Sequence, residues 1–174
     1  MEEKFGWNLN IKRAVPFTLL YSNMNEKLIK QTLLIVEDSD EDFTALKRTI
    51  DKAKVNHPVY RCEDGEEALD FLYHQGEYED EATSPRPSLI ILDLNLPGTD
   101  GREVLATVKQ DHNLKIIPII IFSTSSNPKD IEACYRHGIS GYIVKPMNSS
   151  QLQDLVETFT QYWFEAVELP STQD

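Results

Sequence analysis

Three acidic residues directly follow apolar runs in this sequence. Glu37 and Asp38 come after the run "TLLIV" (32–36), and Asp93 follows the run "LIIL" (89–92) and precedes a Pro-Gly turn. Short, continuous apolar runs of this kind are typical of strands buried on both faces, as in a parallel sheet. Because the functional crevice of an open parallel sheet lies outside the carboxyl ends of its strands, we expect the three carboxylates at one edge.

Polar residues also close two later apolar runs. Ser123 and Thr124 end the run 117–123, and Lys145 ends the run 141–145. The carboxyl ends of the strands form one edge of the sheet, which we call the rim. The rim would then combine three carboxylates, a hydroxyl group and an ammonium group. Carboxylates within about 4 Å of one another repel by several kcal/mol at an effective dielectric near 20. A divalent cation would remove that penalty, and Mg²⁺ suits carboxylate oxygens supplemented by a carbonyl and waters.

Helical segments are expected between the apolar runs. Apolar periodicity and capping residues predict a further strand over 57–64 and helices over 39–53, 65–76, 101–110, 128–138 and from about 149. The polar, proline-containing stretch 77–88 is expected to be a surface loop. Five strand-helix units in a row predict an α/β fold in which helices cover both faces of a parallel sheet.

Composition limits the function classes. A chain of 174 residues with a formal net charge of −12 and no basic patch is expected to be one domain that does not bind nucleic acid directly. No apolar run approaches the roughly 18 to 20 residues that span a bilayer. The acidic start "MEEKFGWNLN" lacks the features of a signal peptide. We therefore expect a cytoplasmic protein without a membrane partner.

The chain from about Thr32 to Glu165 resembles the receiver domain of two-component response regulators. The matching pieces are "LLIVEDS", "LIILDLNLPGTDG", the hydroxyl residue that ends the strand in "IIIFST", and "GYIVKP". The resemblance implies a flavodoxin-like fold, a doubly wound (βα)5 three-layer sandwich with parallel strand order 2-1-3-4-5. The receiver domain is predicted to cover 31–166 and to be followed by a C-terminal tail over 167–174.

Residues 1–30 lie outside the resemblance. They show no sustained periodicity and are predicted to form a flexible N-terminal extension, in which Met24 is an alternative start. The sequence assigns no function to this segment.

The resemblance also implies roles for the rim residues. Asp93 would accept a phosphoryl group from a sensor histidine kinase, and Lys145 would contact the acyl phosphate. Mg²⁺ would be held by Glu37, Asp38 and Asp93 together with the backbone carbonyl of Asn95. The chain would then be a phosphoacceptor switch that catalyses at most its own phosphorylation and dephosphorylation.

The switch residues follow from the same resemblance. Ser123 is preferred over Thr124 as the switch hydroxyl, because the intervals from Asp93 to Ser123 and from Ser123 to Lys145 match those expected of the family. Thr124 would then be the small residue beside the site, although an assignment shifted by one position stays open. A hydrogen bond from Ser123 to the new anion would draw the loop inward and let Tyr142 turn. The output would be an altered surface on the fourth helix, fifth strand and fifth helix.

A closer resemblance involves the lengthened loop within "FLYHQGEYEDEATSPRP" and the C-terminal "YWFEAVELP". Both are similar to segments of the small single-domain regulators that accept phosphate from cyanobacterial phytochrome histidine kinases. This likeness implies a bacterial phytochrome as the kinase, and a homodimer formed through the face from the fourth strand to the fifth helix and through the C-terminal extension.

Three consecutive aromatic residues point independently to an interface. Tyr162, Trp163 and Phe164 cannot all face one core at α-helical spacing. Some apolar area should stay exposed, and such patches usually mark an interface. In the alternative, Tyr162 or Phe164 folds back over its own domain.

Two other functions are alternatives to the phosphoacceptor switch. A pseudo-receiver that only docks partners is disfavoured because every site residue is retained. A phosphatase of the haloacid-dehalogenase type also uses a strand-end aspartate and Mg²⁺. It normally needs a second aspartate two residues later, where this chain has Asn95.

Overall fold

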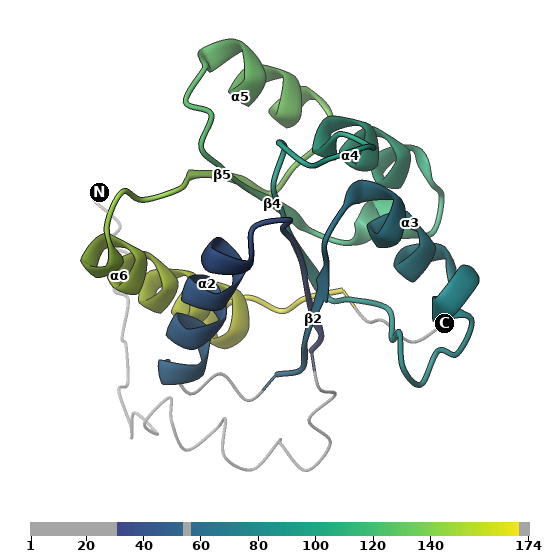
Figure 1. Cartoon of the computed structure of the whole chain (residues 1–174), viewed down its shortest axis with the longest axis horizontal. Coiled ribbons are helices and arrows are strands. Elements are labelled where there is room, and N and C mark those ends of the chain that lie inside the picture. Colours follow the sequence, from purple (N-terminus) through teal and green to yellow (C-terminus); the bar gives the residue numbers. More distant parts are fainter. Residues whose placement is uncertain (1–30, 54–56, 171–174) are drawn as a thin grey trace, which may run out of the picture.

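The computed structural model describes residues 31–53 and 57–170. Its strands form one parallel sheet in the order β2-β1-β3-β4-β5 (Figure 1). The strands are β1 (Leu33–Val36), β2 (Val59–Cys62), β3 (Leu89–Leu92), β4 (Ile119–Ser123) and β5 (Gly141–Val144). The predicted fold class and strand order are confirmed. The predicted extension over 1–30, Met24 and the last four residues of the predicted tail lie outside the described residues.

Five helices connect or follow the strands in the described part of the chain. They are α2 (Asp40–Lys52), α3 (Gly65–Tyr73), α4 (Gly101–Gln110), α5 (Pro128–Arg136) and α6 (Ser149–Thr160). Each begins where a side chain accepts a hydrogen bond from a free backbone N–H of the first turn. The capping residues are Ser39, Asp64, Asp100, Asn127 and Asn148.

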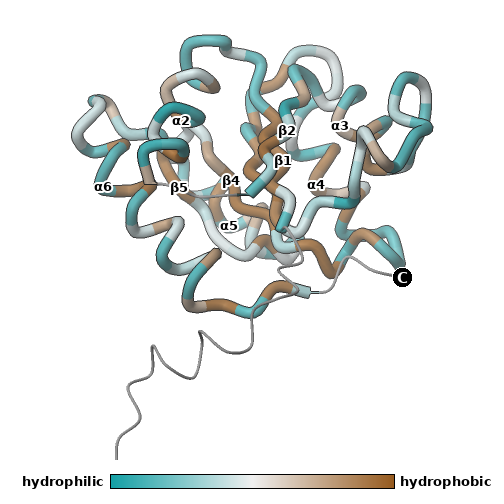
Figure 2. Tube along the Cα trace, turned by 90° about the horizontal axis from the view of Figure 1, so that it is seen from below, coloured by the Kyte–Doolittle hydropathy of each residue, from teal (hydrophilic) through white to brown (hydrophobic). Residues whose placement is uncertain are grey.

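The helices form two layers around the sheet. In Figure 1, α2 and α6 lie on one face, whereas α3 and α4 lie on the other. Side chains of a strand point alternately to the two faces. Leu33 and Ile35 accordingly join the core under α2 and α6, while Leu34 and Val36 join the core under α3 and α4. Figure 2 shows the result as hydrophobic strands enclosed by more hydrophilic helices and loops. No helix within 31–53 and 57–170 is long and apolar enough to cross a membrane.

The stretch 77–88 is more ordered than the surface loop predicted from its composition. It begins within a 3₁₀-helix (Gly76–Tyr78) and folds around the fully buried Ser84. The Ser84 hydroxyl group lies 2.7 Å from the carbonyl oxygen of Tyr78 and 2.9 Å from that of Asp80. Burial of one serine with its hydrogen bonds satisfied thus fixes the path of a polar segment.

The C-terminal aromatic residues lie in a π-helical segment, Gln161–Ala166, that continues α6. The N–H of Val167 donates to the carbonyl of Tyr162, five residues earlier, at 3.1 Å. This wider turn places successive side chains closer together around the axis than an α-helix does. Trp163 and Phe164 therefore both pack against the core, whereas Tyr162 stays 55% exposed.

Phe164 folds back over its own domain, as in the alternative given above. Its ring centroid lies 4.7 Å from that of His57 and 6.2 Å from that of Phe159. Among the three aromatic residues predicted to form an interface, Tyr162 is thus the one that remains exposed. The homodimer itself stays a prediction.

We expect Phe164→Ala to lower the free energy of unfolding by about 2 kcal/mol, because it removes a half-buried ring from the core. Tyr162→Ala is the matched control and should change it by less than about 0.5 kcal/mol. Urea unfolding of dilute protein, followed by circular dichroism, measures both. Equal losses for the two variants would contradict the packing described.

Candidate functional site

The carboxyl ends of β1 and β3 bring three predicted site residues together. The N–H of Glu37 donates to Cys62 at 3.0 Å, and that of Asp93 donates to Val36 at 3.0 Å, so strand pairing continues to the rim. Glu37 and Asp93 are only 2% and 4% exposed, whereas Asp38 is exposed. Carboxylate oxygens of the three residues all lie within 4.8 Å of one another.

Lys145 neutralises part of this negative charge. It follows β5, and its Nζ lies 2.7 Å from Glu37 Oε2, 2.7 Å from Asp93 Oδ2 and 2.8 Å from Asp42 Oδ2. An ammonium group has three N–H donors, so one carboxylate is available for each. Charge-assisted hydrogen bonds of this kind are among the strongest polar contacts in proteins.

Asp42 was missed by sequence reasoning. It belongs to an acidic run, Asp40, Glu41 and Asp42, in the first turn of α2. Acidic residues in a first turn usually stabilise the helix end. That common role gave no reason to expect the contact of Asp42 with Lys145. The available signal was position: α2 starts four residues after β1 ends, so its first turn must lie beside the rim.

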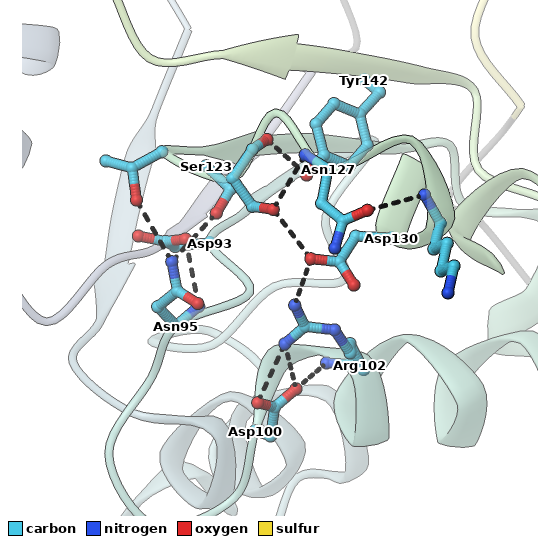
Figure 3. Close-up of polar contacts among 11 residues, drawn as sticks. Asp93, Asn95, Asp100, Arg102, Ser123, Asn127, Asp130 and Tyr142 are labelled. Carbon is cyan, nitrogen blue, oxygen red and sulfur yellow. Dashed lines mark hydrogen bonds and ion pairs between the residues drawn. The ribbon is translucent and has the colours of Figure 1, made fainter. Parts of the chain in front are cut away.

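Asn95 connects Asp93 to the end of β4. Its backbone N–H donates to Asp93 Oδ1 at 3.1 Å, and its side-chain Nδ2 donates to Ser123 Oγ and to Thr124 Oγ1, both at 3.3 Å (Figure 3). Ser123 is fully buried and Thr124 is exposed. Both candidate hydroxyl groups therefore lie beside the site, and the choice between them stays a prediction.

Gly101 lets the start of α4 pack directly behind Asp93. A Cβ atom at this position would lie 2.0 Å from the carbonyl oxygen of Asp93 and 2.8 Å from the Cα of Leu94. The N–H of Gly101 donates to the carbonyl of Leu94 at 3.0 Å. The loop from Asp93 to α4 is thus closed so tightly that only glycine fits.

A second polar network holds the loop between β4 and α5 (Figure 3). The Tyr142 hydroxyl donates to the carbonyl of Ser125 at 2.9 Å, and the Ser125 hydroxyl donates to Asp130 at 2.7 Å. Asp130 also pairs with Arg102 at 3.1 Å, and Arg102 pairs with Asp100 at 3.1 Å. This network ties the loop that carries Ser123 and Thr124 to the start of α4. Of its members, sequence reasoning identified only Tyr142.

Burial and charge shift the pKa values at the rim in a consistent way. Burial raises the pKa of Glu37 above 4.5; the hydrogen bond from Lys145 opposes this shift, and the charge of Asp93 adds to it. Burial lowers the pKa of Lys145, but its hydrogen bonds to the three carboxylates outweigh burial and leave this pKa above the usual lysine value. Lys145 therefore stays charged at neutral pH.

The pKa of Glu37 makes a testable prediction. A carboxyl group with a higher pKa in the folded than in the unfolded protein destabilises the fold as pH rises from its unfolded pKa through its folded pKa. Glu37→Gln keeps the shape and cannot titrate. In chelator-treated protein, the unfolding free energy of the wild type minus that of Glu37→Gln should therefore fall from about pH 4 toward neutral pH. Urea titrations at each pH measure it, and a rising difference would contradict the assignment.

Comparisons with known proteins agree with the fold and the resemblance. A family model for the response regulator receiver domain matches residues 33–157. Response regulator Rcp1 of Synechocystis sp. is 41% identical over 141 residues, which cover 81% of this chain and 94% of Rcp1.

Solved structures give the same result. The crystal structure of the Mn²⁺-bound form of Rcp1 aligns with this chain at 41% sequence identity and a TM-score of 0.76. The alignment covers 81% of this chain and 99% of the Rcp1 chain. The phosphorylated cyanobacterial phytochrome response regulator RcpA is 41% identical with the same coverage and a TM-score of 0.75. The resemblance to phytochrome response regulators is confirmed. The chain therefore belongs to the response regulator receiver family, as a homologue of Rcp1 and RcpA.

Proposed function

We propose that this chain is a phosphorylation-operated switch in which Asp93 accepts a phosphoryl group from a sensor histidine kinase. One observation carries the proposal: the buried Asp93 carboxylate lies at the strand-end rim with Lys145 Nζ 2.7 Å from Oδ2 and two further acidic residues beside it. A buried acidic cluster that faces a lysine is costly as structure alone. It is well suited to phosphoryl transfer, where catalysis consists mainly of positioning and charge neutralisation.

The donor set at the rim fits Mg²⁺. Carboxylate oxygens of Glu37, Asp38 and Asp93 within 4.8 Å of one another suit a small divalent cation that prefers oxygen ligands. In this proposal the backbone carbonyl of Asn95 completes the protein ligands. The ion, when bound, supplies positive charge to the oxygens of the transferring phosphoryl group. The Mn²⁺-bound form of Rcp1 supports the assignment.

The reaction needs few groups from the protein. An ionised Asp93 carboxylate oxygen attacks the phosphorus atom of a phosphohistidine, an O–P bond forms, and the P–N bond to the imidazole breaks. Since the nucleophile is already ionised, no general base is required. Lys145 contacts Asp93 Oδ2 and would donate hydrogen bonds to the phosphoryl oxygens after the transfer.

Phosphorylation would then move the loop between β4 and α5. Ser123, with Thr124 beside it, would donate to the new anion and draw this loop toward Asp93. That movement competes with the hydrogen bond from Tyr142 to Ser125 and the contact of Ser125 with Asp130. Breaking them would let Tyr142 turn and alter the surface formed by α5, β5 and α6.

The similar proteins indicate which histidine kinase could be the partner of this chain. RcpA is described as a cyanobacterial phytochrome response regulator, and a bacteriophytochrome response regulator, RtBRR, is 30% identical with a TM-score of 0.66. We propose a bacterial phytochrome as the histidine kinase and a cytoplasmic, single-domain regulator that forms a homodimer. The exposed Tyr162 is the aromatic residue available to a contact on the C-terminal side.

The experiment is the intact mass after incubation with acetyl phosphate and Mg²⁺. We expect one phosphoryl adduct on the wild type and none on Asp93→Asn or without the metal. Asp38→Asn should reduce the adduct strongly, since it removes a proposed metal ligand and leaves Asp93 in place.

An adduct on Asp93→Asn would contradict the assignment of the phosphoacceptor. If the wild type takes up no phosphoryl group and binds no beryllofluoride, which rules out a short phosphate lifetime, the chain is a pseudo-receiver. A haloacid-dehalogenase phosphatase is disfavoured both by the family match and by Asn95 in place of its second aspartate.

A further inference from the structure

Of the three carboxylates that contact Lys145 in the described part of the chain, that of Asp42 lies outside the proposed metal ligands. Its Oδ2 is 2.8 Å from Lys145 Nζ, and its side chain is 44% exposed. Glu37 and Asp93, the other two partners, have side chains that are 3% and 5% exposed. Asp42 also lies in the first turn of α2, whereas Glu37 and Asp93 follow strands.

Metal binding would compete with Lys145 for Glu37 and Asp93. Lys145 uses its three N–H donors on three carboxylates, and two of these belong to the group whose oxygens come within 4.8 Å of one another. A divalent cation among those oxygens weakens their hold on the ammonium group and repels it directly. Lys145 then needs another anchor to stay at the rim.

We infer that Asp42 is a positioning residue that keeps the Lys145 ammonium at the rim when a divalent cation engages Glu37 and Asp93. The inference rests on the metal site of the proposed function. Since the Asp42 side chain is partly exposed, it is free to adjust as the ammonium group shifts toward a phosphoryl group on Asp93. Without Asp42, the charged end of Lys145 would turn into solvent.

Asp40 provides a matched control in the same helical turn. It pairs with Arg61 at 2.6 Å and does not contact Lys145. Both aspartates place negative charge at the start of α2, where it favours the helix. If Asp42 acted only on helix stability, Asp40→Asn and Asp42→Asn would change the exposure of Lys145 alike. In the inferred role, only Asp42→Asn exposes the Lys145 ammonium group when the metal binds.

The test is the rate at which Lys145 reacts with an amine-acylating reagent, read by peptide mass spectrometry at low conversion. Lys47, which pairs with Asp51 on the exposed side of α2, is the internal reference. Wild type, Asp42→Asn, Asp42→Glu and Asp40→Asn are each labelled with chelator and with saturating Mg²⁺.

We expect Mg²⁺ to raise Lys145 labelling of Asp42→Asn by at least about tenfold, the lower end of the contribution of one hydrogen bond to a charged group. Wild type, Asp42→Glu and Asp40→Asn should change by less than about twofold. The inference is overturned if Mg²⁺ leaves Asp42→Asn labelling unchanged, or if it raises labelling of wild type and Asp42→Asn equally.

The labelling involves no phosphoryl transfer, so it fails separately from the proposed function. An Asp93 adduct on the wild type, with unchanged Lys145 labelling in Asp42→Asn, would overturn only the role of Asp42. No adduct, with the expected labelling, would leave Asp42 as the anchor of Lys145 beside a metal site and would remove the phosphoacceptor role.

Discussion

The contact between the Lys145 ammonium group and three carboxylates is the interaction on which the rest of the site depends. Two of those carboxylates, on Glu37 and Asp93, are almost fully buried, and burying a charge is costly unless it is paired. Lys145 makes their burial tolerable and still leaves the rim short of positive charge. The divalent cation of the proposed function would offset that deficit.

Sheet topology determines which residues can meet at this rim. In the order β2-β1-β3-β4-β5, β1 and β3 are neighbours, so Glu37 and Asp93 meet directly. β4 lies between β3 and β5, so the axes of β3 and β5 are two strand spacings apart, each of roughly 4.8 Å. A long side chain is needed to cross that distance. Lys145 does so past Phe122 of β4, whose ring centroid lies 5.8 Å from Nζ.

Polar contacts also run from Asp93 toward the surface of the domain. Asn95 contacts Asp93 on one side and the hydroxyl groups of Ser123 and Thr124 on the other. Beyond them, Ser125 and Asp130 connect the loop to Tyr142 and Arg102. These hydrogen bonds, together with the peptide link from Thr124 to Ser125, join Asp93 to α5 and β5, the surface that the proposed switch would alter.

Much of this could be predicted from sequence, because apolar runs and the polar residues that end them carry strong local signals. The rest depends on side chains whose partners are distant in sequence. The sequence assigned no role to Asp42: its position after β1 places it beside the rim, but its partner Lys145 lies 103 residues away. The sequence left the inward packing of Phe164 as one of two alternatives, because α-helical spacing does not predict the π-helical turn that allows it. The order of the stretch 77–88 likewise depends on one buried serine, Ser84.

A crystal structure of the chain with Mg²⁺ and beryllofluoride would show whether Asp93 is the phosphoacceptor. We expect a beryllium atom bonded to an Asp93 carboxylate oxygen, with Lys145 Nζ in contact with a fluorine and the metal held by Glu37, Asp38 and Asp93. Beryllofluoride on a different residue, or bound at Asp93 with Lys145 turned away and no metal between the acidic residues, would contradict this arrangement.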